Sequence, residues 1–468
     1  MTTYKQKGKN IYSFIKLALG SEHQDFTTGS IRRAVFLLAI PMMLEMCLES
    51  VFAVVDIFFV SKLGAYATAT VGLTESFLTI VYSIAIGLSM AATAMVARRV
   101  GEKNHEEAAR AGAQAIMLAI TVTIVLSIAG FFFSEDILRA LGADKEVLEK
   151  GTNYARILLT GSVVIMLLFM INGVFRGAGN AAIAMKSLWL ANICNIILCP
   201  VLINGWGPFP EMGLTGAAVA TTIGRGIGVL YQLYHLMFGK GIIRIQLKHF
   251  LPKWEIVRSL LNVASTATLQ FLIASASWIV LIKIISRFGE DAIAGYTIAI
   301  RLIMFFLLPA WGLSNAAVTL VGQNLGAQQP QRAEESVWKT AKYNAVFMLV
   351  VSLLFLLGAE FFVKLITDEA SVMEVSIRAL RIVSLGYVFY GIGMVMMNAF
   401  NGAGDSRTPT WINLFGFWAF QIPLAYLLAV HFDLGPTGVF IAIISAETAI
   451  TVAGVILFRR GRWKKVSI

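Results

Sequence analysis

The sequence predicts an all-α integral membrane protein with twelve transmembrane helices in two six-helix repeats. Three observations support this fold class: the composition suits lipid, apolar runs long enough to cross a bilayer recur along the chain, and its second half repeats the first in a constant register. Of the 468 residues, 57% are hydrophobic and 14% are charged, whereas soluble domains carry about 25% charge. Most of this chain therefore has lipid as its solvent.

The same composition argues against several other classes of protein. The net charge of +11 does not predict a nucleic-acid partner, because the basic residues lie between apolar segments and are not gathered on one soluble face. Cys47, Cys194 and Cys199 all fall in apolar stretches, so we expect neither disulfides nor a metal site. The five histidines are scattered without metal-ligand spacing. We therefore expect no cofactor and no enzymatic activity.

Twelve apolar runs have the length of about 20 residues that crosses about 30 Å of hydrocarbon. They cover residues 33–60, 67–97, 111–133, 153–176, 183–204, 213–238, 257–286, 292–319, 338–362, 378–400, 408–431 and 436–458. These runs divide the chain into an N-terminal segment (1–32), a first six-helix half (33–238), a linker (239–256), a second half (257–458) and a basic tail (459–468).

The positions of lysine and arginine predict the orientation of these spans in the membrane. If the N-terminus is cytoplasmic, 26 of the 38 basic residues lie on the inner side and 8 on the outer side, with 4 inside or near the ends of spans. Cytoplasmic loops of membrane proteins carry this excess of positive charge. We therefore expect a multi-pass protein of the cytoplasmic (inner) membrane of a bacterium, with both termini in the cytoplasm.

An internal repeat relates the two halves at an offset of 225 residues. Gly-Leu-Ser at residues 87–89 recurs at 312–314, and the same offset relates several other glycines of the two halves. The pairs are Gly64 and Gly289, Gly101 and Gly326, and the Gly-Ala-Gly strings at 177–179 and 402–404. Because each half has six spans, both halves enter the membrane in the same sense. Transporters of this kind enclose a cavity between their halves and open it alternately to the two sides of the membrane.

The first span carries three acidic residues, Glu45, Glu49 and Asp56. A charged side chain at the centre of a membrane helix costs about 2.5–3.5 kcal/mol on insertion scales, so each is a functional candidate. At 100° per residue, their spacing places them within about 40° of one another in a stripe roughly 16 Å long. Such a stripe could exchange protons or bind sodium. Alternatively, Glu45 or Glu49, and to a lesser extent Asp56, is a neutral residue with interhelical hydrogen bonds.

The second half has lost these acids, because Gln270 takes the place of Glu45 and Leu281 that of Asp56. Ion chemistry should therefore be concentrated in the first half. Other polar residues inside spans, Asn172 among them, suit interhelical hydrogen bonds. Methionines such as Met46 could form adaptable apolar walls. The predicted substrate cavity accordingly includes Met46, Asn172, Gln270 and Tyr390.

Several short motifs, in order along nearly the whole chain, resemble those of the multidrug and toxic compound extrusion (MATE) family. They are Ala39-Ile40-Pro41, the run from Val55 to Gly64, Gly-Leu-Ser at 87–89, Asn195 with Pro200, and the run from Val321 to Ala327. The resemblance implies a V-shaped fold in which the two halves form an N-lobe and a C-lobe. It also implies the exchange of external protons or sodium for an outgoing substrate.

The resemblance also implies roles for individual residues. Asp56 takes the place of the coupling carboxylate, Asn195 lies in its neighbourhood, and Pro41 marks the point where the first helix bends. Two departures from the family pattern matter: Cys199 stands where an aspartate often follows the asparagine, and the acids of one branch are missing near Ala274 and Tyr390. A sodium site in the C-lobe is therefore not expected, and Glu45 or Glu49 could share the coupling role.

The sequence thus predicts a cation-coupled antiporter, driven by protons or sodium, that exports amphipathic and cationic organic compounds by alternating access. We expect it to act as a monomer among membrane lipids on a small-molecule substrate. The alternative is a flippase for lipid-linked saccharides from the same superfamily. Twelve spans and an acidic first helix count against that alternative, since such flippases often have extra helices and a strongly cationic cavity.

Overall fold

The computed structural model describes residues 15–20, 25–239, 241–466 and 468. Parts of three predicted segments therefore lie outside the described residues: 1–14 and 21–24 of the N-terminal segment, Lys240 of the linker and Ser467 of the tail. The described part contains helices and no strand. This agrees with the predicted all-α class.

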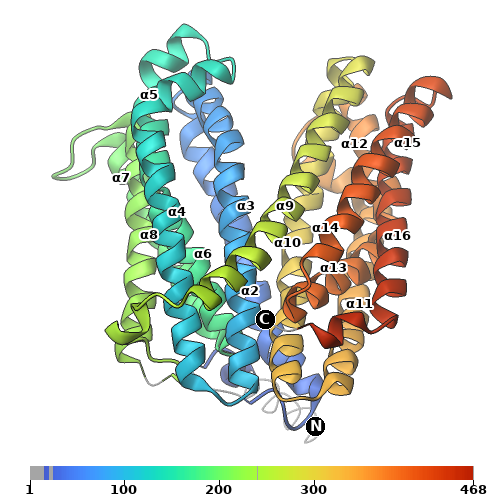
Figure 1. Ribbon diagram of the computed structural model, residues 1–468. Helices are drawn as coiled ribbons and strands as arrows, with labels where there is room; N and C mark the ends of the chain where they lie inside the picture. Colours follow the sequence, from blue (N-terminus) through green and yellow to red (C-terminus); the bar gives the residue numbers. More distant parts are fainter. Residues whose placement is uncertain (1–14, 21–24, 240, 467) are drawn as a thin grey trace, which may run out of the picture.

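Helices from the first half of the chain form one arm of the molecule (Figure 1). They are α2 (Ile31–Ser61), α3 (Ala65–Gly101), α4 (His105–Ala140), α5 (Lys145–Thr160), α6 (Ser162–Gly177), α7 (Ala181–Asn204) and α8 (Gly213–Phe238). A connecting segment with a short helix, η1 (Leu247–Phe250), leads from α8 to the second arm.

The second arm is built from the other half of the chain. Its elements are α9 (Trp254–Ile285), η2 (Ser286–Phe288), α10 (Glu290–Gly326), α11 (Pro330–Lys364), α12 (Ala370–Ser384), α13 (Tyr387–Ala403), α14 (Arg407–Asn413), the π-helix η3 (Leu414–Gln421), α15 (Ile422–Tyr426), the π-helix η4 (Leu427–His431), α16 (Pro436–Arg459) and η5 (Arg462–Lys465).

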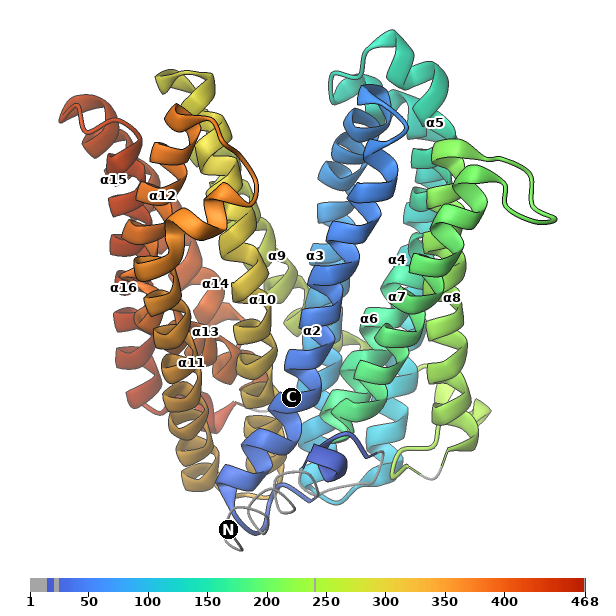
Figure 2. The same ribbon diagram turned by 180° about the vertical axis from the view of Figure 1, so that it is seen from behind.

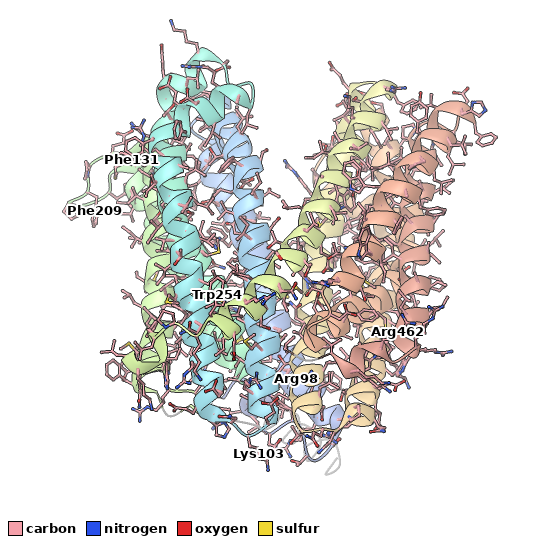
Figure 3. All side chains as sticks on the ribbon, viewed as in Figure 1. Arg98, Lys103, Phe131, Phe209, Trp254 and Arg462 are labelled. Carbon is pink, nitrogen blue, oxygen red and sulfur yellow. The ribbon has the colours of Figure 1, made fainter. Side chains whose placement is uncertain are left out.

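The two arms meet at the end that holds both termini and diverge toward the other end, so the molecule is a V (Figures 1 and 2). Helix α9 starts beside the first arm, where Trp254 is labelled in Figure 3, and runs across to the second. Helix α2 crosses in the opposite sense and packs against α10 of the other arm. The predicted arrangement of two lobes is thereby confirmed.

Twelve membrane spans are confirmed in the described part of the chain. Eleven helical segments are long and apolar enough to cross a bilayer, with α5 and α6 counted together, and α12 and α13 form the twelfth span with a bend of 59°. Large apolar side chains on the outer surface, such as Leu357 (84% exposed) and Phe132 (69% exposed), suit contact with lipid tails.

Several helices extend beyond the predicted apolar runs. Helix α3 covers 65–101 where the run was 67–97, and α4 covers 105–140 where the run was 111–133. At the start of α4, a capping side chain supports the extension beyond the apolar run. The side chain of Asn104 accepts a hydrogen bond from the backbone N–H of Glu107 at 3.1 Å, which satisfies one free donor in the first turn of α4.

The repeat in the sequence is also a repeat in the structure. Adding 225 to the bounds of α3 gives the bounds of α10, residue for residue. The preceding glycines, Gly64 and Gly289, have φ of +109° and +99°. A side chain at either position would be strained, so glycine is required at both equivalent corners.

Equivalent glycines also bring α3 and α10 into close contact where the lobes meet. A Cβ atom on Gly101 would collide with the backbone carbonyl of Gln323, and one on Gly326 would collide with that of Arg98. Arg98 and Gln323 are themselves related by the offset of 225 residues. The lobes are thus joined about a pseudo-two-fold axis, near the position of Arg98 in Figure 3.

Candidate functional site

The three acidic residues of the predicted stripe all lie on α2, but their surroundings differ. Glu45 is almost fully buried, with an exposed fraction of 1%, whereas Glu49 and Asp56 are partly buried. Helix α2 packs against α7 and α8 of its own lobe, and these helices with α6 supply the polar side chains that reach the stripe. The stripe therefore lies along the inside of the N-lobe and not toward lipid.

Glu45 is paired with a positive charge. Its carboxylate accepts a hydrogen bond from the guanidinium of Arg176 on α6 and another from Asn172 Nδ2 at 3.2 Å. Asn172 in turn accepts hydrogen bonds from Ser187 Oγ at 3.0 Å and Gln232 Nε2 at 2.6 Å. Asn172 thus belongs to a buried polar network that connects four helices of the N-lobe.

Glu49 is paired in the same way with a second arginine. Its Oε1 lies 3.3 Å from Arg225 Nη2 on α8, and its Oε2 accepts a hydrogen bond from Asn192 Nδ2 at 3.0 Å. The side chain of Arg225 is 3% exposed, and its guanidinium carbon lies 5.8 Å from the ring centres of both Phe52 and Tyr82. These contacts hold a buried positive charge beside the stripe.

Asp56 has no such partner. Among the described residues no lysine, arginine or histidine forms an ion pair with it, and Cys199 Sγ lies 4.0 Å from its Oδ1. The nearby Asn195 is buried and donates a hydrogen bond to Thr221 Oγ1 at 2.8 Å, not to Asp56. Asp56 therefore differs from the other two acids in having no basic partner in an ion pair among the described residues.

The second half replaces one of these ion pairs with a neutral pair. Asn401 Nδ2 donates a hydrogen bond to Gln270 Oε1 at 3.3 Å. Adding 225 to Glu45 gives Gln270, and adding 225 to Arg176 gives Asn401. The same contact between two equivalent helices is thus ionic in the N-lobe and uncharged in the C-lobe.

Two adjoining cavities lie between the lobes. One has a volume of about 210 Å³ and is lined by Met46, Glu49 and Arg176 of the N-lobe and by residues of α10. The other has a volume of about 390 Å³ and is lined by Gln270, Tyr390 and part of α3. Three of the four residues predicted for the substrate cavity therefore line a cavity. Asn172, which is 2% exposed, lines neither of them.

Pro41 lies in the buried part of α2, close to the junction of the lobes. The helix continues through it from Ile31 to Ser61, although a proline cannot donate the hydrogen bond that Leu37 O would otherwise accept. One turn further on, Trp189 Nε1 donates a hydrogen bond to Leu44 O at 3.1 Å. The backbone of Met42 is in close contact with Gly312 of α10. A bend here would move the stripe relative to the C-lobe.

The pairing arginines were missed at the level of sequence. Neither Arg176 nor Arg225 was among the predicted site residues, but the structure places both beside the acidic stripe. The repeat contains a hint of the pairing of Arg176. Glu45 and Arg176 are the counterparts of Gln270 and Asn401, so the same two positions are polar in both halves. No group of three or more potential metal ligands occurs among the described residues.

Comparison with known proteins bears on the function of this site. The family model MatE matches residues 41–201 and 267–427, once in each half. The Probable multidrug resistance protein NorM of Thermotoga maritima is 26% identical over 465 residues, which cover 98% of this chain and 97% of that protein.

Solved structures show the same fold. A MOP superfamily transporter from Pyrococcus furiosus superposes with a TM-score of 0.89 at 27% identity, over 94% of this chain and 98% of that one. A MATE protein in the straight conformation superposes with a TM-score of 0.87 at 28% identity, over 93% of this chain and 96% of that one.

Proposed function

The chain belongs to the MATE family of secondary transporters, which are not enzymes, and from this premise we propose that it exports amphipathic organic cations in exchange for an inward-moving proton or sodium ion. It is a multi-pass membrane protein of a drug-exporter family. We further propose that it acts as a monomer in the cytoplasmic membrane. The multidrug resistance name of its relative supports export over the flipping of lipid-linked saccharides.

We assign the coupling role to Asp56. The observation that carries this assignment is that Asp56 is the acid of the stripe without a basic partner, whereas Glu45 and Glu49 each contact an arginine. An unpaired carboxylate away from bulk water gains most from binding a cation. Glu45 and Glu49 contribute by holding Arg176 and Arg225 in place, and Asn195 by ordering the helix beside Asp56.

Cation uptake by Asp56 changes the charge of α2 within the N-lobe. We propose that this change bends α2 at Pro41, where the helix lacks one hydrogen bond. Because Met42 contacts Gly312 of α10, a bend at this point alters the packing between the lobes. The V opens away from the termini, so with cytoplasmic termini this conformation faces the outside.

Transport into membrane vesicles, with proton and sodium gradients imposed separately, tests this proposal. The wild-type protein should accumulate a fluorescent organic cation under one of the two gradients. The Asp56→Asn variant should lose accumulation while still being expressed and folded. Asp136→Asn, which changes an exposed acid at the end of α4, is the matched control and should transport normally.

Two results would contradict the proposal. Normal gradient-driven transport by Asp56→Asn would remove the coupling role from Asp56. Transport of lipid-linked saccharides, with no transport of any organic cation by the wild-type protein, would favour the flippase instead.

A further inference from the structure

A second unpaired acid lies in the C-lobe. Glu447 on α16 lines the 390 Å³ cavity, and its exposed fraction is 9%. Among the described residues it takes part in no hydrogen bond or ion pair, in contrast to Glu45 and Glu49. The offset of 225 makes Thr222 its counterpart and Leu281 the counterpart of Asp56. The two unpaired acids therefore occupy unrelated positions in the two lobes.

The cavity around Glu447 offers no internal cation. No lysine, arginine or histidine lines this cavity or a third, smaller space of about 30 Å³ that also borders Glu447. The other titratable groups that line these spaces are tyrosines: Tyr390 and Tyr387 of α13, and Tyr82 of α3 on the far wall. No charged residue from α9, α12, α14 or η3 lines either space. The basic residue that lines the neighbouring 210 Å³ cavity, Arg176, is paired with Glu45. Any charge on Glu447 must therefore be balanced by something that enters.

The walls of the cavity suit an apolar ligand that carries a positive charge. Aromatic rings of Phe271, Trp311, Tyr390 and Phe417 line it, and the first two have their ring centres 5.6 Å apart. Rings of this kind attract cations through their negative faces. The thioethers of Met304, Met394 and Met397 add polarisable surface that adapts to different shapes. A volume of about 390 Å³ lies in the range of small-molecule sites.

Irregular helices place these groups around Glu447. The bend of 59° between α12 and α13 comes just before Tyr390, whose N–H donates to Gly386 O at 3.0 Å in the first turn after the bend. Opposite it, the π-helix η3 carries Phe417 into the cavity wall. Wide helical turns of this type are frequent at functional sites.

We propose that Glu447 is the anionic anchor of a binding site for monovalent organic cations in the C-lobe cavity, and that a bound cation replaces a proton on its carboxyl group. An isolated ionised carboxylate is costly in apolar surroundings, so the empty cavity holds the neutral acid. When a cation enters, the proton passes to solvent and the net charge of the site is unchanged. This inference rests on the proposed export of organic cations, but it concerns a site separate from Asp56.

Binding of tetraphenylphosphonium to the full-length protein in detergent tests the inference. Calorimetry in two buffers of different ionisation enthalpy, near neutral pH, measures the affinity and the protons released. The wild-type protein should release about one proton for each bound cation. Glu447→Gln should bind the cation about tenfold more weakly or worse and release no proton, whereas Glu447→Asp should keep the release.

Two controls show whether an effect of Glu447→Gln comes from the loss of the anchoring carboxylate. The first tests whether the variant is folded, and the second tests whether the coupling residue Asp56 is involved. Triphenylphosphine oxide, an uncharged probe of similar shape, should bind equally to the wild-type protein and to Glu447→Gln. Asp56→Asn should bind tetraphenylphosphonium and release a proton as the wild-type protein does, even where it no longer transports.

Unchanged affinity and proton release in Glu447→Gln would overturn this inference and leave the role of Asp56 standing. Binding of the cation by the wild-type protein without release of a proton would also overturn the inference and leave the role of Asp56 standing. Loss of cation binding and proton release in Asp56→Asn alone would move the anchor to the N-lobe. Normal transport by Asp56→Asn would instead remove the coupling proposal and leave the anchor at Glu447 intact.

Discussion

Arg176 and Glu45 form a buried ion pair whose counterpart in the second half is an uncharged pair, Asn401 and Gln270. Breaking a buried pair on one side leaves an uncompensated charge, which costs more than the pair itself contributes. Replacing both partners with a neutral pair avoids that cost. The second half of the chain thus shows that an uncharged hydrogen bond can replace the ion pair at the equivalent helix contact.

We expect Glu45→Gln to lower the free energy of unfolding by about 3 kcal/mol, because it leaves the guanidinium of Arg176 without an anion. The double variant with Glu45→Gln and Arg176→Asn copies the second half and should recover most of this loss. Unfolding in detergent titrated with sodium dodecyl sulfate, followed by circular dichroism, measures both.

The exposed pair Glu135 and Arg139 is a matched control for this cycle. Glu135→Gln should change the free energy of unfolding by at most about 1 kcal/mol, because exposed pairs contribute little. A double variant no more stable than Glu45→Gln alone would show that the two contacts are not equivalent.

At the scale of the helices, α3 and α10 approach each other through glycines that leave no room for a side chain. Gly101 faces the carbonyl of Gln323, and its repeat partner Gly326 faces that of Arg98. Inserting a methyl group into a contact this close costs about 1–3 kcal/mol. The close contact therefore stabilises the conformation in which the lobes meet at this end of the molecule.

Gly101→Ala should shift the population away from the open V. Spin labels at Leu141 and Ile366, exposed equivalent positions just after the ends of α4 and α11, report the distance between the two arms in a background without the three native cysteines. We expect shorter distances between these labels in the variant, as the junction loosens and the arms approach.

Gly72→Ala is the control on the same helix, because a methyl group on Gly72 meets no atom within 4 Å. It should leave the distances unchanged and stabilise α3 slightly through its helix propensity. Identical distance distributions for Gly101→Ala and the wild-type protein would argue against a role for this contact in setting the conformation.

At the scale of the whole molecule, the C-terminal tail connects the lobes at the closed end. Arg98 of the N-lobe donates a hydrogen bond to the main-chain oxygen of Val466, and Arg99 Nη2 donates one to that of Ile468 at 3.2 Å. The tail is fixed to the C-lobe by the fully buried Trp463 and by the ion pair of Lys464 with Glu334. The tail therefore holds the two lobes together at the end of the molecule where they meet.

A chain that ends at Lys464 should favour the open V less than the full-length chain, since it keeps Trp463 and Lys464 but loses both arginine contacts. The same pair of spin labels at Leu141 and Ile366 should then give a larger share of short distances. Full-length Lys465→Ala changes an exposed residue of the tail and should behave as the wild-type protein. Equal distributions for all three chains would exclude a role of the tail in holding the lobes.

Much of the fold could be predicted from the sequence because it depends on length and register. A span needs a certain number of apolar residues, and an offset of 225 can be counted along the chain. The bend between α12 and α13, the π-helices and the exact helix ends could not be predicted. They depend on contacts with neighbouring helices and on capping side chains.

The sequence by itself determined the twelve spans, the two halves and the acidic stripe on α2. The tertiary structure alone decided which of those acids are paired, because their partners lie 131 and 176 residues away along the chain. It also placed Glu447, one of many polar residues within spans, in a cavity without a cation. Helical periodicity is a local property of the chain, whereas the neutralisation of a buried charge depends on whichever helices the fold brings beside it.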